Sequence, residues 1–101
     1  MTHEILVGLH VSDNDKYQEY RDAMMPILRK YGGGFRTDFI VSETLKPSDK
    51  KNVNRVFTIY FRDKQSVQEF FNDPEYVVVK KKFYEKSATE THMLASYNQS
   101  E

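Results

Sequence analysis

The sequence has no cysteine. A chain without thiols can form no disulfide, no thiolate nucleophile, no iron–sulfur cluster and no cysteine-bound zinc site. It also has no excess of charge of either sign, because 15 Lys and Arg residues balance 15 Asp and Glu residues. Proteins that bind nucleic acids usually carry a basic excess, so we expect no nucleic-acid partner.

Long apolar runs are missing as well. No stretch approaches the roughly 20 apolar residues that span a bilayer. The start Met-Thr-His-Glu lacks the basic and apolar parts of a signal peptide. We therefore expect no membrane association and a cytoplasmic location. With 39% hydrophobic and 30% charged residues, the composition is typical of one globular domain over residues 1–101.

What the chain does contain is a regular succession of strand-like and helix-like segments. Ser12 to Asp15 place capping and acidic side chains ahead of an apolar stripe with helical spacing, which predicts a helix that Pro26 should kink. Three glycines from Gly32 end this helix. The expected elements are strands over residues 4–11, 35–45, 53–61 and 89–97, helices over 16–31, after Asp63 and over 75–86, and a hairpin loop over 46–52.

This βαββαβ order is typical of the α+β class. Right-handed crossovers place the first and third strands at the centre of a four-stranded antiparallel sheet, with the helices on one face. Alternation along the strands then assigns the side chains to the two faces. Residues expected to face the helices are Ile5, Val7, Leu9, Phe57, Ile59, Phe61, Met93 and Ala95. Residues expected to face away are Leu6, Gly8, His10, Val56, Thr58, Tyr60, His92, Leu94 and Ser96.

The face turned away from the helices is too apolar for open water and too polar for a dry core. Apolar surface left in water is unfavourable by about 25 cal/mol per Å². A second copy of the same sheet, related by a twofold axis, would cover this face and enclose a lined cavity. The sequence therefore predicts a homodimer closed sheet against sheet, in which the second strand, at an edge, also contacts the partner.

Two histidines are the first candidates for chemistry in such a cavity. His10 and His92 lie on neighbouring strands and on the face away from the helices, and histidine transfers protons near neutral pH. Tyr60, on the same face, can bind a ligand or stabilise an oxyanion. The alternative for each histidine is a partly buried, hydrogen-bonded side chain near an end of the sheet. The alternative for Tyr60 is packing in the interface with its hydroxyl hydrogen-bonded. Two histidines without a carboxylate at ligand spacing make a poor metal site, so we expect no metal.

Four further residues are candidates for ligand binding. Arg36 and Asp38 are expected to share a strand face and to flank the mouth of the pocket, with an exposed ion pair as the alternative. Thr58 is expected on the cavity face. Tyr17 lies on the apolar stripe of the first helix, where packing against the sheet is the alternative.

Two motifs resemble a known family. One is the helix with Tyr17, Tyr20 and Arg21 that leads into Tyr31-Gly32-Gly33, and the other is the run from Phe70 to Tyr76. Together they are similar to the dimeric α/β-barrel superfamily of ferredoxin-like fold, and within it to the family called domain of unknown function 1330. The resemblance covers nearly the whole chain and implies a homodimeric α/β barrel.

The chain departs from that family at two positions. Lys80-Lys81-Lys82 stands where the family usually has an arginine, and we interpret these lysines as a solvated helix face. Tyr60 stands where the third strand often has an acidic residue. The wider superfamily includes heme-degrading and quinone-forming monooxygenases, lactone isomerases and stress-response proteins. The fold alone does not choose among these functions.

We expect a protein that binds a small apolar or aromatic molecule in the barrel or in a cavity between the helices and the sheet. The alternative is a monooxygenase- or isomerase-like enzyme that needs no cofactor and uses His10 or His92 as acid and base. The segment Arg55 to Phe61 faintly resembles the third strand of RNA-recognition domains, but it lacks their adjacent glycine and its Phe57 and Phe61 are expected to face inward. The first strand also has no outward aromatic residue. An acylphosphatase-like anion loop is disfavoured, because the acidic stretch Ser12 to Asp15 would repel phosphate.

Overall fold

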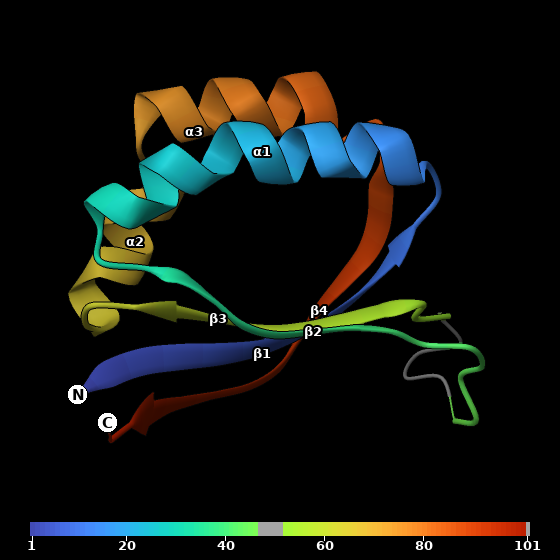
Figure 1. Cartoon of the computed structure of the whole chain (residues 1–101), viewed down its shortest axis with the longest axis horizontal. Coiled ribbons are helices and arrows are strands. Elements are labelled where there is room, and N and C mark those ends of the chain that lie inside the picture. The colour runs from blue at the N-terminus through green and yellow to red at the C-terminus, as the bar shows by residue number, and fades with distance from the viewer. Residues whose placement is uncertain (47–51, 101) are drawn as a thin grey trace.

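The computed structural model describes residues 1–46 and 52–100, and it shows the expected order of elements (Figure 1). The hairpin loop expected over 46–52 lies largely outside the described residues. The elements are β1 (Thr2–Val11), α1 (Asn14–Lys30), β2 (Gly34–Ile40), β3 (Arg55–Phe61), α2 (Lys64–Phe71), α3 (Pro74–Val79), the π-helical turn η2 (Lys80–Tyr84) and β4 (Ala88–Gln99).

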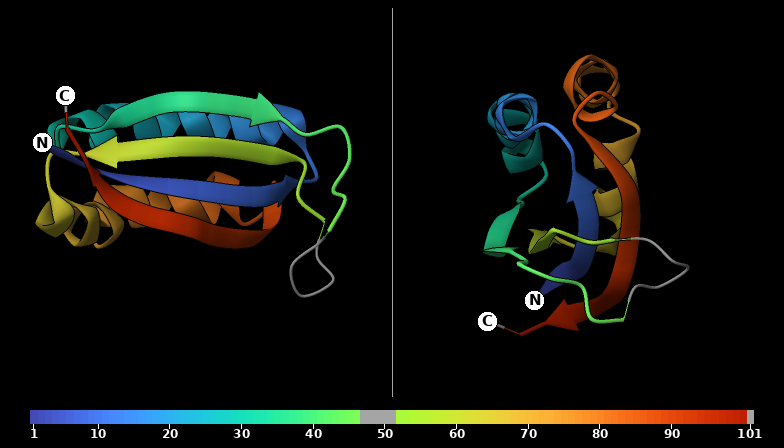
Figure 2. Two further views of the ribbon diagram at one scale, coloured as in Figure 1. Left: turned by 90° about the horizontal axis from the view of Figure 1, so that it is seen from below. Right: turned by 90° about the vertical axis from the view of Figure 1, so that its right-hand side faces the viewer.

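The strands form one antiparallel four-stranded sheet in the order β2-β3-β1-β4. The prediction that the first and third strands lie at the centre and the second at an edge is therefore confirmed. Figure 2 shows the four strands side by side with the helices behind them, and Figure 1 shows α1 and α3 on the same side of the sheet. The opposite side, which we call the outer face, carries no helix of the described part of the chain.

Local signals in the sequence set the helix ends. The Asp13 side chain accepts a hydrogen bond of 3.0 Å from the Lys16 backbone N–H and caps α1. Asp63 caps α2 in the same way, with 2.8 Å to the Ser66 backbone N–H. Gly32 follows α1 with a φ of 68°, a conformation that glycine adopts without strain. The helix α1 continues through Pro26 to Lys30, so this proline does not end it.

A bulge in β4 corrects the assignment of two residues to the faces of the sheet. Met93 pairs with Val7 on the helix side, as expected, but the register then shifts, so that Ala95 pairs with Leu6. Ala95 therefore lies on the outer face and Ser96 on the helix side, the reverse of the prediction. The physical reason is that a bulge puts one extra residue into the strand and shifts the alternation of side chains.

A second bulge, in β2, separates two residues that were expected to share a face. The register with β3 shifts between Phe35 and Thr37, which makes Arg36 the extra residue. Arg36 then contacts Glu4 on the outer face, whereas Asp38 pairs with Phe57 and faces the helices. The prediction that Arg36 and Asp38 share a strand face is therefore wrong, because strict alternation does not hold across a bulge.

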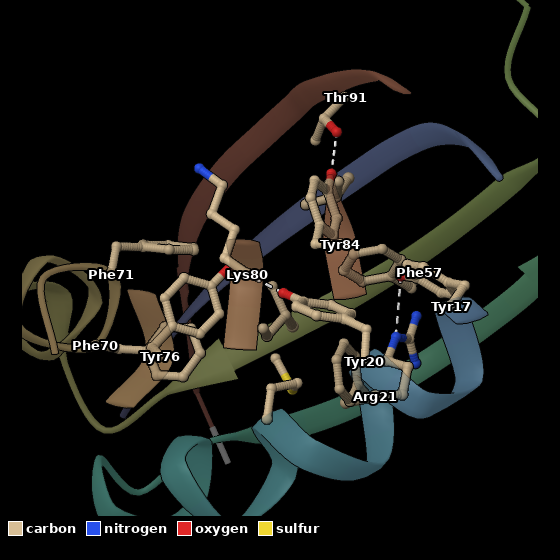
Figure 3. Close-up of a pocket in the computed structure, with 14 residues that line it drawn as sticks. Tyr17, Tyr20, Arg21, Phe57, Phe70, Phe71, Tyr76, Lys80, Tyr84 and Thr91 are labelled. Carbon is tan, nitrogen blue, oxygen red and sulfur yellow. Dashed lines mark hydrogen bonds between the residues drawn. The ribbon is translucent and has the colours of Figure 1, made fainter. Parts of the chain in front are cut away.

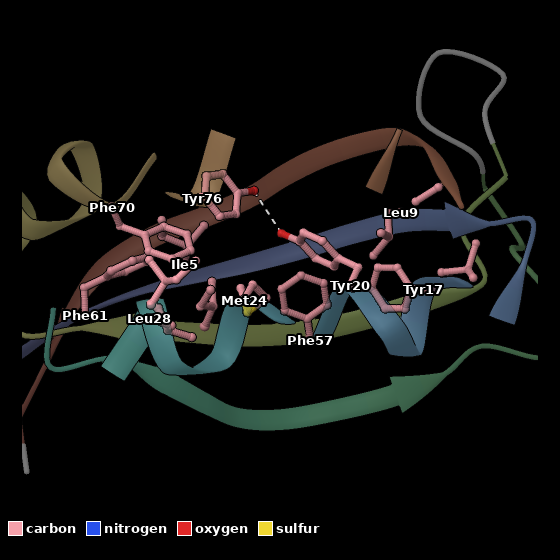
Figure 4. Packing of buried hydrophobic residues seen from close by; sticks show 14 residues of the cluster. Ile5, Leu9, Tyr17, Tyr20, Met24, Leu28, Phe57, Phe61, Phe70 and Tyr76 are labelled. Atoms are coloured by element: carbon pink, nitrogen blue, oxygen red, sulfur yellow. Dashed lines mark hydrogen bonds between the residues drawn. The ribbon is translucent and has the colours of Figure 1, made fainter. Parts of the chain in front are cut away.

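The hydrophobic core fills the space between the sheet and the helices (Figure 4). Its centre is aromatic, with Phe61 and Phe70 fully buried and their ring centroids 5.5 Å apart. The inward residues of the central strands β1 and β3 belong to this core, as alternation predicts. None of the described helices is both long enough and apolar enough to cross a membrane.

Candidate functional site

A cavity of about 240 Å³ lies between the helices and the sheet (Figure 3). Its wall is built from α1, α2, α3, η2 and the inward faces of the strands, and most of that wall is aromatic or aliphatic. The lining residues are Val7, Tyr17, Tyr20, Arg21, Met24, Phe35, Phe57, Ile59, Phe70, Phe71, Tyr76, Lys80, Tyr84 and Thr91.

The helix α1 supplies one wall because its apolar stripe faces the sheet. Tyr17, Tyr20 and Met24 recur at helical spacing on this stripe and are buried. Arg21 lies four residues after Tyr17 and therefore belongs to the same stripe, although it is charged. A cationic side chain is thus held within an aromatic wall.

Arg21 is 8% exposed, and one of its nitrogens has no partner in the part of the chain that the structure describes. Its Nε donates to the Tyr17 hydroxyl at 3.0 Å, and its Nη1 donates to the Asp38 carboxylate at 3.2 Å. The guanidinium carbon lies 3.9 Å from the centroid of Phe35 and 4.6 Å from that of Phe57. Nη2 is buried and has no hydrogen-bond partner among the described residues.

Asp38 holds a second arginine beside the cavity. The Arg55 guanidinium donates two hydrogen bonds to the Asp38 carboxylate, at 2.8 and 2.7 Å, while Arg21 contacts the same group. Burial alone would raise the pKa of Asp38, but the hydrogen bonds and charges of the two arginines outweigh burial and lower it. Two cations therefore share one carboxylate, which leaves this end of the cavity with a positive charge.

Phenol groups from three elements meet in the cavity. The hydroxyls of Tyr20 and Tyr76 are hydrogen-bonded at 2.9 Å, which joins α1 to α3. Burial raises the pKa of Tyr17, Tyr20 and Tyr84 above the ordinary value, and that of Tyr76 to about 12. These hydroxyls therefore stay protonated at neutral pH and do not act as phenolate bases.

The π-helical turn η2 brings Tyr84 and Lys80 to the cavity. In this turn the Glu85 backbone N–H bonds to the Lys80 carbonyl five residues earlier, at 3.1 Å. The wider turn places Tyr84 against Tyr20, with ring centroids 4.9 Å apart, and lets its hydroxyl bond to Thr91 on β4. Lys80 is exposed and lines the cavity where α3 becomes η2, so its ammonium marks the mouth (Figure 3).

Among the residues predicted for catalysis or binding, Tyr17 lines this cavity. Thr58 lies on the outer face, where it contacts Thr37 at 2.7 Å. Tyr60 lies there too, with its ring 4.6 Å from the guanidinium carbon of Arg36. Neither contributes to the cavity between helices and sheet. Their proposed roles would require a cavity enclosed on the outer face.

His10 and His92 also lie on the outer face. Gly8 pairs with His92, and His10 follows Gly8 by two residues on β1, so both side chains point away from the helices. His10 Nδ1 and His92 Nε2 are buried and have no hydrogen-bond partner among the described residues. The two imidazoles lie on the same face, as expected. The sheet separates both of them from the aromatic cavity.

The outer face holds a polar cluster that the sequence did not reveal. Glu4 is 4% exposed, and its carboxylate accepts a hydrogen bond of 2.6 Å from Arg36 Nε. The Tyr97 hydroxyl donates to the other carboxylate oxygen. The described residues contain no group of three or more His, Asp or Glu side chains able to hold a metal ion.

Sequence reasoning missed Arg21, Lys80 and Tyr84 as cavity residues. The signal for Arg21 was present, because an arginine four residues after Tyr17 interrupts an apolar stripe. Lys80 was interpreted as part of a solvated face. Regular α-helical spacing places Phe83, seven residues after Tyr76, on the stripe of Tyr76, whereas the structure places Tyr84 at the cavity. No local sequence pattern predicts the π-helical turn, which changes this spacing.

The chain is similar to known proteins over nearly its whole length. A family model described as a domain of unknown function (DUF1330) matches residues 5–97. No curated protein matches the chain by sequence. A protein of unknown function from Rhodopseudomonas palustris has a similar structure, with a TM-score of 0.77 at 14% identity over 92% of this chain and 78% of that chain.

Two further solved structures are similar in fold. A mutant of SnoaB, a cofactor-independent oxygenase from Streptomyces nogalater, gives a TM-score of 0.60 at 11% identity over 97% of this chain and 95% of that chain. A dimeric protein of unknown function and ferredoxin-like fold from Bacteroides fragilis gives 0.52 at 12% identity over 97% and 96%. The chain therefore has the ferredoxin-like α+β fold that its element order predicts.

Proposed function

Since this chain belongs to the DUF1330 family, whose function is unknown, we propose a function from the cavity. The protein binds a small, largely aromatic molecule between its helices and its sheet. The observation that carries the proposal is the buried Nη2 of Arg21, a donor with no acceptor among residues 1–46 and 52–100, in a wall that is mostly aromatic and aliphatic. Binding pockets typically combine apolar walls with a few such polar groups.

The size of the cavity limits the ligand. An engineered cavity of about 150 Å³ in another protein binds benzene, and pockets for drug-sized ligands range from about 300 to 1,000 Å³. A cavity of about 240 Å³ therefore suits a molecule with one or two aromatic rings. Edge-to-face contacts with Phe35, Phe57 and the tyrosines would hold such rings.

The polar groups of the cavity favour binding over acid–base catalysis. The lining phenols are protonated donors, and the lining residues include no carboxylate and no histidine. The alternative of a cofactor-independent monooxygenase- or isomerase-like enzyme rests on His10, His92 and Tyr60, which lie on the outer face. It is supported only by a shared fold with the oxygenase SnoaB.

The proposal is tested by titrating the protein with β-naphthoate and with β-naphthamide, using calorimetry and amide chemical shifts. Val7→Phe adds a ring to the cavity wall and should weaken binding of both probes by about tenfold or more. Val78→Phe, at a position that is 63% exposed on α3, is the matched control and should leave both affinities unchanged. If neither probe binds the wild type at millimolar concentration, the proposal fails.

We also propose that the outer face forms the interface of a homodimer. This face carries exposed apolar side chains, with Phe39 57% and Leu94 50% exposed, beside Leu6, Val56 and Ala95. A protein with a similar fold from Bacteroides fragilis is described as dimeric, which supports the proposal. A twofold copy would cover the apolar residues and place His10 and His92 of both copies around an enclosed space.

A further inference from the structure

We infer, building on the proposed function, that the cavity selects an aromatic carboxylate over the neutral analogue of the same shape, with Arg21 holding the carboxylate inside and Lys80 attracting it at the mouth. The inference concerns the charge of the ligand, which the size and the aromatic wall do not determine. Three features of the cavity support it: the sign of the lining charges, the geometry of Arg21 and the state of the phenol groups.

The charged residues that line the cavity have one sign. Arg21 and Lys80 are the charged lining residues, and no Asp or Glu is among them. Asp38 contacts Arg21 from outside the lining, but it is shared with Arg55, which binds it at 2.7 Å. The group of two arginines and one aspartate therefore keeps one positive charge, which a bound anion would neutralise in a weakly screened environment.

Arg21 is positioned to receive an oxygen atom. Its Nε and Nη1 are occupied by Tyr17 and Asp38, and its ring contacts with Phe35 and Phe57 fix the plane of the guanidinium. The side chain is more than nine-tenths buried, and Nη2 remains as a donor without an acceptor among the described residues. The guanidinium is charged, so a carboxylate gains the attraction between opposite charges in addition to the hydrogen bond, whereas a neutral amide gains the hydrogen bond without that attraction.

The phenol pair adds a second donor. One hydrogen atom suffices for the bond between the Tyr20 and Tyr76 hydroxyls, so the other hydroxyl hydrogen is available to a ligand. Both phenols resist ionisation, since burial raises the pKa of each. Inside the cavity a ligand oxygen can therefore accept from Arg21 Nη2 and from this hydroxyl. A carboxylate, which is ionised at neutral pH and accepts without donating, fits this set better than a phenol, which is neutral there.

The experiment compares three ligands of one shape against the full chain by calorimetry at neutral pH. β-Naphthoate should bind about tenfold more tightly than β-naphthamide and β-naphthol. Lys80→Gln should reduce the ratio of naphthoate affinity to naphthamide affinity by about threefold, because the variant removes a charge that attracts the anion but not the neutral ligand. Lys81→Gln, which removes the same charge from the neighbouring exposed residue outside the lining, is the matched control and should change neither affinity.

A second variant tests the inner group. Arg21→Gln should abolish the preference for naphthoate, and Lys80→Gln keeps the inference testable if Arg21→Gln does not fold. Equal binding of naphthoate and a neutral analogue by the wild type would overturn the inference while leaving the proposed function intact. A preference that persists in both variants would also overturn it, because the anion would then be held elsewhere. Failure of all three ligands to bind would instead remove the proposed function.

Discussion

The hydroxyl groups of Tyr20 and Tyr76 lie 2.9 Å apart and connect α1 to α3 across the cavity. Both side chains are buried, so removal of one hydroxyl leaves the other without its partner. We expect Tyr76→Phe to lower the free energy of unfolding by about 1–2 kcal/mol. Urea denaturation followed by circular dichroism measures this change.

The double variant Tyr20→Phe with Tyr76→Phe provides the control for that experiment. Replacement of both hydroxyls leaves no unpaired donor, so its cost should be smaller than the sum of the two single costs. Additive costs would show that the two hydroxyls do not interact in solution.

The contact of Asp38 with Arg55 and Arg21 predicts how stability changes with pH. The pKa of Asp38 is lower in the folded chain than its ordinary value, so its stabilising contribution is complete above that value and is lost as pH falls through the folded pKa. We expect Asp38→Asn to cost about 1 kcal/mol at neutral pH and markedly less near pH 3. Urea unfolding of wild type and variant at both pH values gives the difference, and a cost that does not shrink in acid would contradict the prediction.

The backbone of Gly33 lies close to the backbone of β3. A Cβ atom at this position would lie 2.6 Å from the Tyr60 carbonyl oxygen and 2.6 Å from Leu28 Cδ1. The carbonyl is backbone and cannot move aside, so Gly33→Ala should lower the free energy of unfolding by about 2 kcal/mol or more.

Gly8, in β1, offers a comparison with Gly33, which precedes β2. The nearest atoms to its added Cβ would be side-chain carbons of Leu94 and Val53 at 3.2 Å, which can shift slightly. Gly8→Ala should therefore cost clearly less than Gly33→Ala in thermal or urea unfolding. The opposite ranking would show that the turn after α1 differs in solution.

The outer face predicts the mass of the protein in solution. Sedimentation equilibrium should give about twice the chain mass of 12.0 kDa. Leu94→Glu places a charge in the apolar part of that face and should shift the mass towards a single chain, because an unpaired buried charge is costly. Val78→Glu, on the helix layer, should leave it unchanged. A wild type that sediments at 12.0 kDa would refute the homodimer.

The histidine variants separate the two faces of the sheet. His10→Gln combined with His92→Gln should leave naphthoate affinity within about twofold of wild type, because the sheet lies between these side chains and the cavity. A large loss of binding would place the ligand on the outer face. It would support the histidine-based alternative instead of the cavity between helices and sheet.

The sequence by itself determined the order of the elements, the caps at Asp13 and Asp63, and the inward residues of β1 and β3. These features depend on neighbours along the chain, on the alternation of regular strands and on the handedness of crossovers, all of which can be derived without coordinates. For the same reason the strand order of the sheet was predicted correctly. The family was predicted correctly on other grounds, from the resemblance carried by the first helix and by the run from Phe70 to Tyr76.

Only the tertiary structure decided the composition of the cavity. Because of the bulge at Arg36, the residues Arg36 and Asp38 lie on opposite faces of the sheet instead of the same face. The turn η2 places Tyr84, rather than Phe83, against Tyr20. A bulge or a π-helical turn adds one residue to a regular repeat, and what stabilises it is contact with other elements rather than the local sequence. The side chains beyond such an insertion change face, and the site therefore had to be found in three dimensions.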